Sequence, residues 1–269
     1  MNGHFGLRAA AVLGAVAFEV TLVPQGLLAQ APWTERGSRP SIALEVQKPS
    51  FADGDFSFAT GAAFLSARVP AGHIVLIGEL PAAFGSISDA SSTVIGNPYL
   101  GLETGGTEVV GELGMRLPIA NVSGDDDFAT GVGVFSDFDR LEAFTEDLMS
   151  VRAAVRFDRR DAGGFGFGGT MAPALFIPTN DGDAELFVGY AARASYAWAG
   201  ASVGAEFSGR LLVTEGDLNF GERTVHQVAL GAGVDLGPWR PGAYFRLPLD
   251  RDLTDTVNHV FGLSLALRF

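Results

Sequence analysis

The chain contains no cysteine, so no disulfide can stabilise it. Charged residues are scarce, at 18% of the sequence, although the formal net charge is −13. After the N-terminal region no run of 18 or more apolar residues lacks a charge, which excludes a bundle of membrane-spanning helices. Glycine is abundant, with 36 residues, and the mean hydropathy is +0.24. Soluble globular chains rarely combine these features, whereas a membrane β-barrel confines its charges to its loops and lumen.

The last nine residues of the sequence alternate strictly in polarity. Between Phe261 and Phe269 every odd position holds a large apolar side chain, and every even position holds a small or charged one. This period of two predicts a strand with one apolar and one polar face. In a soluble domain such a strand would be an aggregation-prone edge. It suits a closed barrel, in which both edges of the strand are paired and its apolar face meets lipid.

Segments with the same alternation recur from residue 41 onward and predict an all-β, transmembrane, antiparallel up-and-down barrel of about 12 strands. We expect strands at 41–48, 55–69, 73–84, 94–104, 107–121, 150–160, 164–177, 184–198, 201–213, 222–236, 239–249 and 256–269. Five of the connections are tight and contain glycine, which supplies the positive φ of short hairpins. The connections between them, at 49–54, 85–93, 122–149, 178–183, 214–221 and 250–255, are longer. This alternation predicts short periplasmic turns and long external loops.

The N-terminal region is predicted to be a targeting segment. Residues 1–29 have a basic start at Arg8, an apolar stretch from Ala9 to Ala17, and small residues before a cleavage site after Ala29. An uncleaved buried helix is the alternative. Residues 30–40 are interpreted as a periplasmic lead-in, and 41–269 as the barrel. The sequence therefore predicts export to the outer membrane.

The six long connections hold most of the negative charge. They contain 17 acidic and 2 basic residues, a sum of −15, which leaves +2 for the rest of a chain whose net charge is −13. The acidic loops could simply keep the surface soluble. Alternatively, their carboxylates could bind divalent cations that bridge the surrounding anionic lipid.

The longest connection, 122–149, does not show the pattern of a strand. Ser136 could cap a short helix of about 137–148, in which Phe138, Leu141, Glu142 and Thr145 fall at helical spacing. Such a helix could lie over the mouth of the barrel, fold into the lumen, or rest on lipid.

Most charged side chains within the predicted strands share the inward-facing parity. A charge at lipid depth costs roughly 2–4 kcal/mol for arginine, so this common parity supports the topology. We expect the lumen to be lined by Arg116, Arg152, Arg156, Arg193, Arg210, Arg240, Arg246, Glu112, Glu206 and Tyr244. These groups could form ion pairs that hold the shape of the barrel. They could instead form a constriction that orients anionic or polar solutes.

Signals of catalysis and of cofactor binding are weak. None of His73, His226 and His259 stands in a His-x-Ser arrangement like that of outer-membrane lipid hydrolases, so we do not expect an enzyme. The Gly-rich segment 163–169 has no lysine and alternates with phenylalanine, and 181–185 lacks the full ligand spacing of a calcium loop. We therefore expect no cofactor, no metal site and no nucleic-acid partner.

Two segments carry a resemblance to known proteins. Residues 94–102 read VIGNPYLGL, which resembles a segment that opens an early strand in transporter-like barrels of the phenol-degradation meta-pathway family. The last strand, ending at Phe269, resembles the signal by which the barrel-assembly machinery recognises outer-membrane barrels. The resemblance to this family implies passage of aromatic or other small hydrophobic solutes. The inward arginines do not fit that expectation, because a purely hydrophobic solute would not favour a charged lumen.

The sequence as a whole predicts an outer-membrane pore or facilitator for the passive uptake of small solutes through an arginine-lined lumen. The alternative is a closed structural or adhesive barrel that displays acidic extracellular loops.

Overall fold

A computed structural model describes residues 39–52, 60–87, 90–104, 108–120, 127–215 and 219–269. The predicted signal peptide at 1–29 and nearly all of the predicted lead-in at 30–40 lie outside these described residues.

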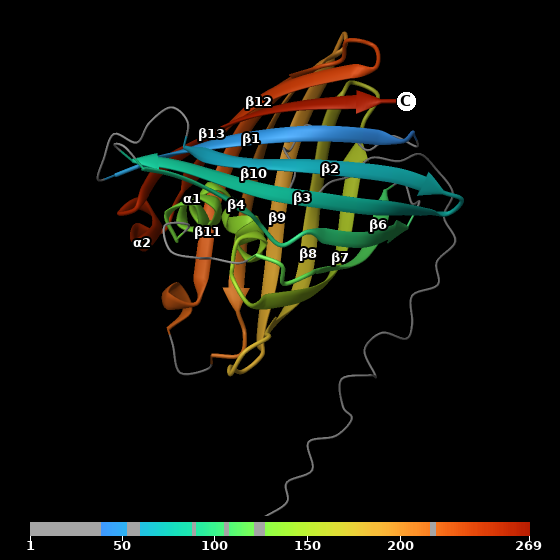
Figure 1. The fold of residues 1–269 in the computed structure, drawn as a ribbon. Helices are drawn as coiled ribbons and strands as arrows, with labels where there is room; N and C mark the ends of the chain where they lie inside the picture. Colours follow the sequence, from blue (N-terminus) through green and yellow to red (C-terminus); the bar gives the residue numbers. More distant parts are fainter. Residues whose placement is uncertain (1–38, 53–59, 88–89, 105–107, 121–126, 216–218) are drawn as a thin grey trace, which may run out of the picture.

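The described residues form one antiparallel sheet that closes on itself (Figure 1). Its strands are β1 Ser41–Phe51, β2 Gly61–Ala71, β3 Ile74–Ile87, β4 Ala90–Ile95, β5 Tyr99–Thr104, β6 Val109–Arg116, β7 Leu148–Arg160, β8 Phe165–Pro178, β9 Glu185–Trp198, β10 Ala201–Leu212, β11 Thr224–Val234, β12 Trp239–Pro248 and β13 Val257–Arg268. Both β4 and β5 pair with β3, so they are two parts of one interrupted strand. Counted in this way, the barrel has the predicted 12 strands.

The barrel closes where the first and last strands pair. β1 runs antiparallel to β13, with Ser41 opposite Arg268 and Lys48 opposite Phe261, while its other edge pairs with β2. β13 in turn pairs with β12, so neither the first nor the last described strand has a free edge, which suits a β-structure that sits in lipid.

The outer surface of the barrel is apolar, as the alternation predicted. Leu113, Val155 and Leu263 expose 57%, 59% and 53% of their surface. The residues that flank them along the strands, among them Glu112, Arg156 and Ser264, are buried toward the interior. Among the described residues, no helix is long and apolar enough to span a membrane.

Two predicted boundaries are wrong. The expected long connection 85–93 is mostly strand, because β3 and β4 pair up to Ile87 and Ala90. β6 ends at Arg116 and not near 121, since the chain there turns to bond the interruption between β4 and β5. The six-residue stretch 250–255 contains a short helix, α2 Arg251–Thr254, and η4 Phe220–Glu222 lies before β11.

The helix in the long connection is present but lies earlier than predicted. Residues Asp127–Ser136 form α1, and Phe138–Ala143 form a 3-10 turn, η3. Ser136 is therefore the last residue of α1 and not a cap; its hydroxyl donates to the carbonyl of Val132. Asp137 caps η3 by accepting from the N–H of Asp139. The predicted helix over 137–148 does not continue, because the residues after Ala143 turn to pack on the barrel wall.

Candidate functional site

Residues 127–147, here called the plug, lie inside the barrel. α1 packs against β3 and β2, and η3 packs against β7 and β10 (Figure 1). Of the three placements that the sequence left open, the structure shows the one in the lumen. The helix α1 thus packs on the wall made by β1 to β4, whereas η3 reaches β7 and β10.

The plug docks on the interruption between β4 and β5. The ring of Phe144 packs edge-on against Phe64 of β2, with centroids 5.7 Å apart. Gly96 leaves the space for this ring, because a Cβ there would meet both the ring and the carbonyl of Ala143. Asn97 donates from Nδ2 to the carbonyls of Glu142 and Thr145, at 3.1 and 2.7 Å. The segment that carried the family resemblance is therefore, in this chain, a docking point for the plug.

Arg140 of the plug lies at the centre of a buried ion-pair network. Its guanidinium contacts Glu79 of β3 at 2.9 Å, Glu45 of β1 at 3.0 Å and Asp137 at 2.6 Å. Asp137 is also 2.7 Å from Arg246 of β12. Burial alone would raise the pKa of Asp137, but the positive charges of Arg140 and Arg246 hold that pKa below its ordinary value. Asp137 is therefore ionised and joins the plug to the wall.

Glu142 forms the second link between the plug and the wall. One of its oxygens accepts from both terminal nitrogens of Arg210 of β10, at 3.0 Å each, and the other lies 3.7 Å from Arg116 of β6. Burial favours a higher pKa for Glu142, yet the two arginines lower it. Asp137, Asp139 and Glu142 were counted among the acids of an external loop. That assignment is wrong, because all three lie inside the barrel: Asp137 and Glu142 pair with wall arginines, and Asp139 accepts from Ser208 and Gln227 of the wall.

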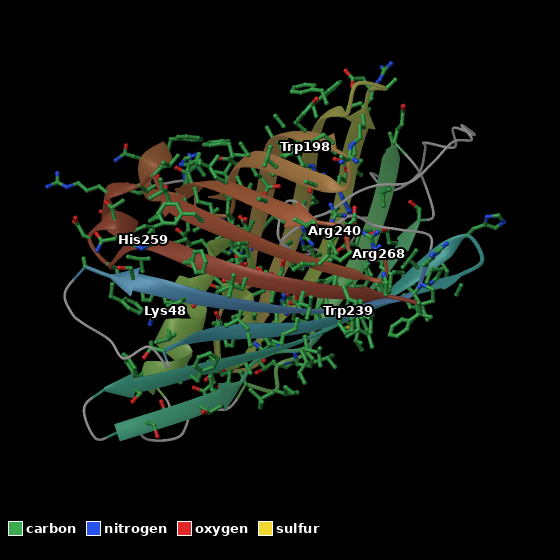
Figure 2. The ribbon with its side chains drawn as sticks, turned by 90° about the horizontal axis from the view of Figure 1, so that it is seen from above. Lys48, Trp198, Trp239, Arg240, His259 and Arg268 are labelled. Atoms are coloured by element: carbon green, nitrogen blue, oxygen red, sulfur yellow. The ribbon has the colours of Figure 1, made fainter. Side chains whose placement is uncertain are left out.

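Each of the seven predicted arginines has a carboxylate within 4.0 Å. The remaining pairs are Arg116–Glu79 at 2.7 Å, Arg152–Glu112 at 3.1 Å, Arg156–Glu103 at 3.4 Å, Arg193–Asp158 at 2.7 Å and Arg240–Asp235 at 3.8 Å. Figure 2 shows Arg240 and Arg268 near each other, and Asp235 lies within reach of both. Tyr244 donates to Glu45. This geometry is that of ion pairs that hold the barrel and the plug together.

A cleft remains between the plug and the wall formed by β7 to β10. Its empty space, including the part open to solvent, is about 460 Å³. It is lined by Asp139, Arg152, Ala172, Ala174, Phe187, Gly189, Tyr190, Ala191, Glu206, Ser208 and Arg210. Three of the ten predicted residues, Arg152, Glu206 and Arg210, line this cleft. The other seven are not among its lining residues.

The small side chains of the cleft were missed in the sequence, although a signal for them exists. Ala172 on β8 and its cross-strand partner Gly189 on β9 both fall on the inward parity of neighbouring strands, and Ala191 follows at the next inward position. Adjacent strands with small inward residues leave a hollow on the inner wall. Asp139 could not be placed from the sequence, because its position depends on how the plug folds.

His226 forms a second polar cluster near the start of β11. Its Nε2 lies 2.7 Å from the hydroxyl of Tyr190 and its Nδ1 lies 3.1 Å from Asp250, whose other oxygen accepts from the His226 N–H. The ring stacks on Phe207, a residue of the apolar outer surface. The cluster is thus part of the outer wall and meets the lining of the cleft only through Tyr190. Among the described residues, no group of three or more candidate ligands is placed to hold a metal ion.

No family model and no curated protein matches the chain. Solved structures do match. The COG4313 outer membrane channel from Pseudomonas putida F1 superposes with a TM-score of 0.60 at 11% identity, over 86% of this chain and 95% of that one. The NanC porin superposes with a TM-score of 0.54 at 6% sequence identity, over 86% of this chain and 100% of the porin. LpxR from Salmonella typhimurium superposes with a TM-score of 0.53 at 13% sequence identity, over 85% of this chain and 100% of LpxR.

The fold is that of outer-membrane β-barrels. At these identities the likeness establishes the architecture alone.

Proposed function

We propose that the protein is an outer-membrane channel through which small polar solutes diffuse passively along the cleft beside the plug. The observation that carries the proposal is the cleft that remains between Asp139 of the plug and the inner wall of β7 to β10, while α1 packs against β1 to β4. An apolar belt outside and a polar, partly open interior suit a membrane channel. The proposal also includes export of the chain by the signal peptide at residues 1–29, and recognition of the last strand by the barrel-assembly machinery.

Under this proposal, the ten predicted lumen residues fall into two groups, one that meets the solute and one that holds the structure. Arg152, Arg210 and Glu206 line the cleft and would meet the solute. We assign a structural role to Arg116, Arg156, Arg193, Arg240, Arg246, Glu112 and Tyr244, which pair with other side chains of the barrel or the plug.

Narrowing the cleft tests the proposed path. Ala191 faces the cleft, whereas its neighbour Ala192 is exposed on the outer face. In planar bilayers we expect Ala191→Trp to reduce the single-channel conductance, because the indole would occupy the path. The matched variant Ala192→Trp should conduct like the unaltered protein, since its indole would lie in lipid.

A cysteine variant separates blockage from misfolding. Because the chain has no cysteine of its own, Ala191→Cys can be treated with a bulky thiol reagent after the channel has been inserted and its current recorded. We expect the current to fall after the reagent is added. A current that does not change would contradict the proposed path.

The alternative function is that of a closed structural or adhesive barrel. The ion pairs that seat the plug favour it, because buried arginine–carboxylate pairs resist displacement. The absence of current steps from protein whose heat-modifiable mobility shows a folded barrel would support this alternative over the channel.

A further inference from the structure

We infer that the cleft selects solutes bearing a cationic group, such as an ammonium or guanidinium, and that the carboxylate of Glu206 binds this group. The inference rests on the proposed channel function and names the class of solute. It opposes the expectation, drawn from the inward arginines, that the lumen would orient anions.

The arginines that line the cleft are already neutralised. Arg152 donates to Glu112 at 3.1 Å, and Arg210 donates twice to Glu142 at 3.0 Å. A third bond from Arg210 goes to the backbone carbonyl of Asp139 at 2.6 Å. An arginine whose donors are engaged by a carboxylate presents little net attraction to an anion in the cleft.

The two lining carboxylates are different, because neither has an arginine partner. Asp139 accepts from the Ser208 hydroxyl at 2.9 Å and from the Gln227 amide at 2.7 Å, both neutral donors. Among the described residues, the Glu206 side chain has no hydrogen bond and no cationic nitrogen within ion-pair distance, although its backbone lies in the ladder with β9 and β11. Its cross-strand neighbour Arg193 is held by both oxygens of Asp158, at 2.7 Å each.

The lining of the cleft therefore carries excess negative charge when both carboxylates are ionised, and a bound cationic group favours the ionised form. The open space is lined by two arginines that each contact a carboxylate, and by two carboxylates without an arginine partner. A carboxylate in a confined, low-dielectric space gains most from a bound counter-charge. The small side chains of Ala172, Gly189 and Ala191 leave room for that charge to arrive on a solute rather than on a protein side chain.

Blocking of the KCl current by size-matched probes of opposite charge tests the inference. We would compare 1,4-diaminobutane, a dication, with succinate, a dianion, in planar bilayers. For the unaltered protein we expect the diamine to reduce the current, succinate to have no effect, and the reversal potential in a KCl gradient to report preference for K⁺.

Replacement of Glu206 should remove this preference. A charged hydrogen bond is lost in Glu206→Gln, so the concentration of diamine that halves the current should rise by about tenfold or more. Glu206→Asp, which keeps the charge, should retain most of the block. Glu215→Gln carries the same change of charge on an exposed loop and should behave like the unaltered protein.

The possible failures are distinguishable. A conducting channel that is blocked by succinate and not by the diamine, or a Glu206→Gln channel with unchanged block and reversal potential, would overturn the inference while leaving the channel function intact. Folded protein that gives no current would overturn the channel function itself.

Discussion

At the scale of single residues, Asp137 shows how one carboxylate can join the plug to the wall. It is 1% exposed and lies within 2.7 Å of both Arg140 of the plug and Arg246 of β12. Removing one partner of a buried pair leaves the other charge uncompensated, which costs more than the pair itself contributes. The seating of the plug therefore depends on this side chain more than on the many paired arginines of the wall.

The variant Asp137→Asn should lower the free energy of unfolding by about 3–5 kcal/mol, because Arg140 and Arg246 lose a shared counter-charge. Urea titration of protein folded in liposomes measures this difference. Asp181→Asn removes the same charge from an exposed loop and should change stability by less than about 0.5 kcal/mol. Equal effects of the two substitutions would contradict the buried network.

The same variant has a distinct pH signature. The pKa of Asp137 is lowered in the folded protein, so its stabilisation is fully present above its ordinary pKa of 3.8 and is lost as pH falls through the folded value. The stability difference between the unaltered protein and Asp137→Asn should thus stay constant from pH 7 to about 5 and shrink in more acidic buffer. A difference that shrinks instead as pH rises from 5 to 7 would show that Asp137 is not an ionised partner.

The face of each arginine could be predicted from the sequence, but its partner could not. Parity along a strand decides whether Arg246 points inward or outward, because a residue two positions away shares its face. Its partner Asp137 is 109 positions away along the chain, in a segment without strand pattern. The open carboxylate of Glu206 was placed inside correctly, yet only the structure shows that Arg193 is engaged by Asp158.

At the scale of elements, the interruption between β4 and β5 joins the wall to the plug. Gly96, Asn97 and Pro98 leave the ladder so that the Asn97 side chain can bond the plug and the turn after β6 on opposite sides. The sequence analysis predicted one continuous strand over 94–104 and missed this interruption, because its role depends on contacts with the distant plug. The helix in the long connection was misplaced for a similar reason. Tertiary packing of Phe144 overrides the helical spacing that continues after Ala143.

Gly96→Ala should therefore weaken docking of the plug. The added methyl group meets the carbonyl of Ala143 and the ring of Phe144, and forcing such overlap typically costs about 1–3 kcal/mol. Gly78→Ala on β3 is a matched control, because nothing lies within 4 Å of its added Cβ. Thermal unfolding followed by heat-modifiable mobility should separate the two variants. A loss in Gly78→Ala as large as that in Gly96→Ala would contradict this account of docking.

At the scale of the whole molecule, the barrel is the part that the sequence predicts best. Alternation along each strand and glycine in the tight turns are local signals, and closure follows because lipid tolerates no free sheet edge. The plug depends on matching charges between a loop and the wall, which is a global property. Counting Asp137 and Glu142 as external was wrong because their partners on the wall, Arg116, Arg210 and Arg246, are dispersed over three strands.

The most direct test of the account is whether residue 139 meets the inner face of β10 in the membrane. The Asp139 carboxylate lies 2.9 Å from the Ser208 hydroxyl, and the chain has no native cysteine to interfere with cross-linking. Protein carrying Asp139→Cys and Ser208→Cys should be joined internally by a short bifunctional thiol reagent. Protein carrying Asp139→Cys and Phe207→Cys should not, because Phe207 is the neighbouring residue on the lipid-facing side. Cross-linking of the second pair and not the first would contradict a plug seated inside the barrel.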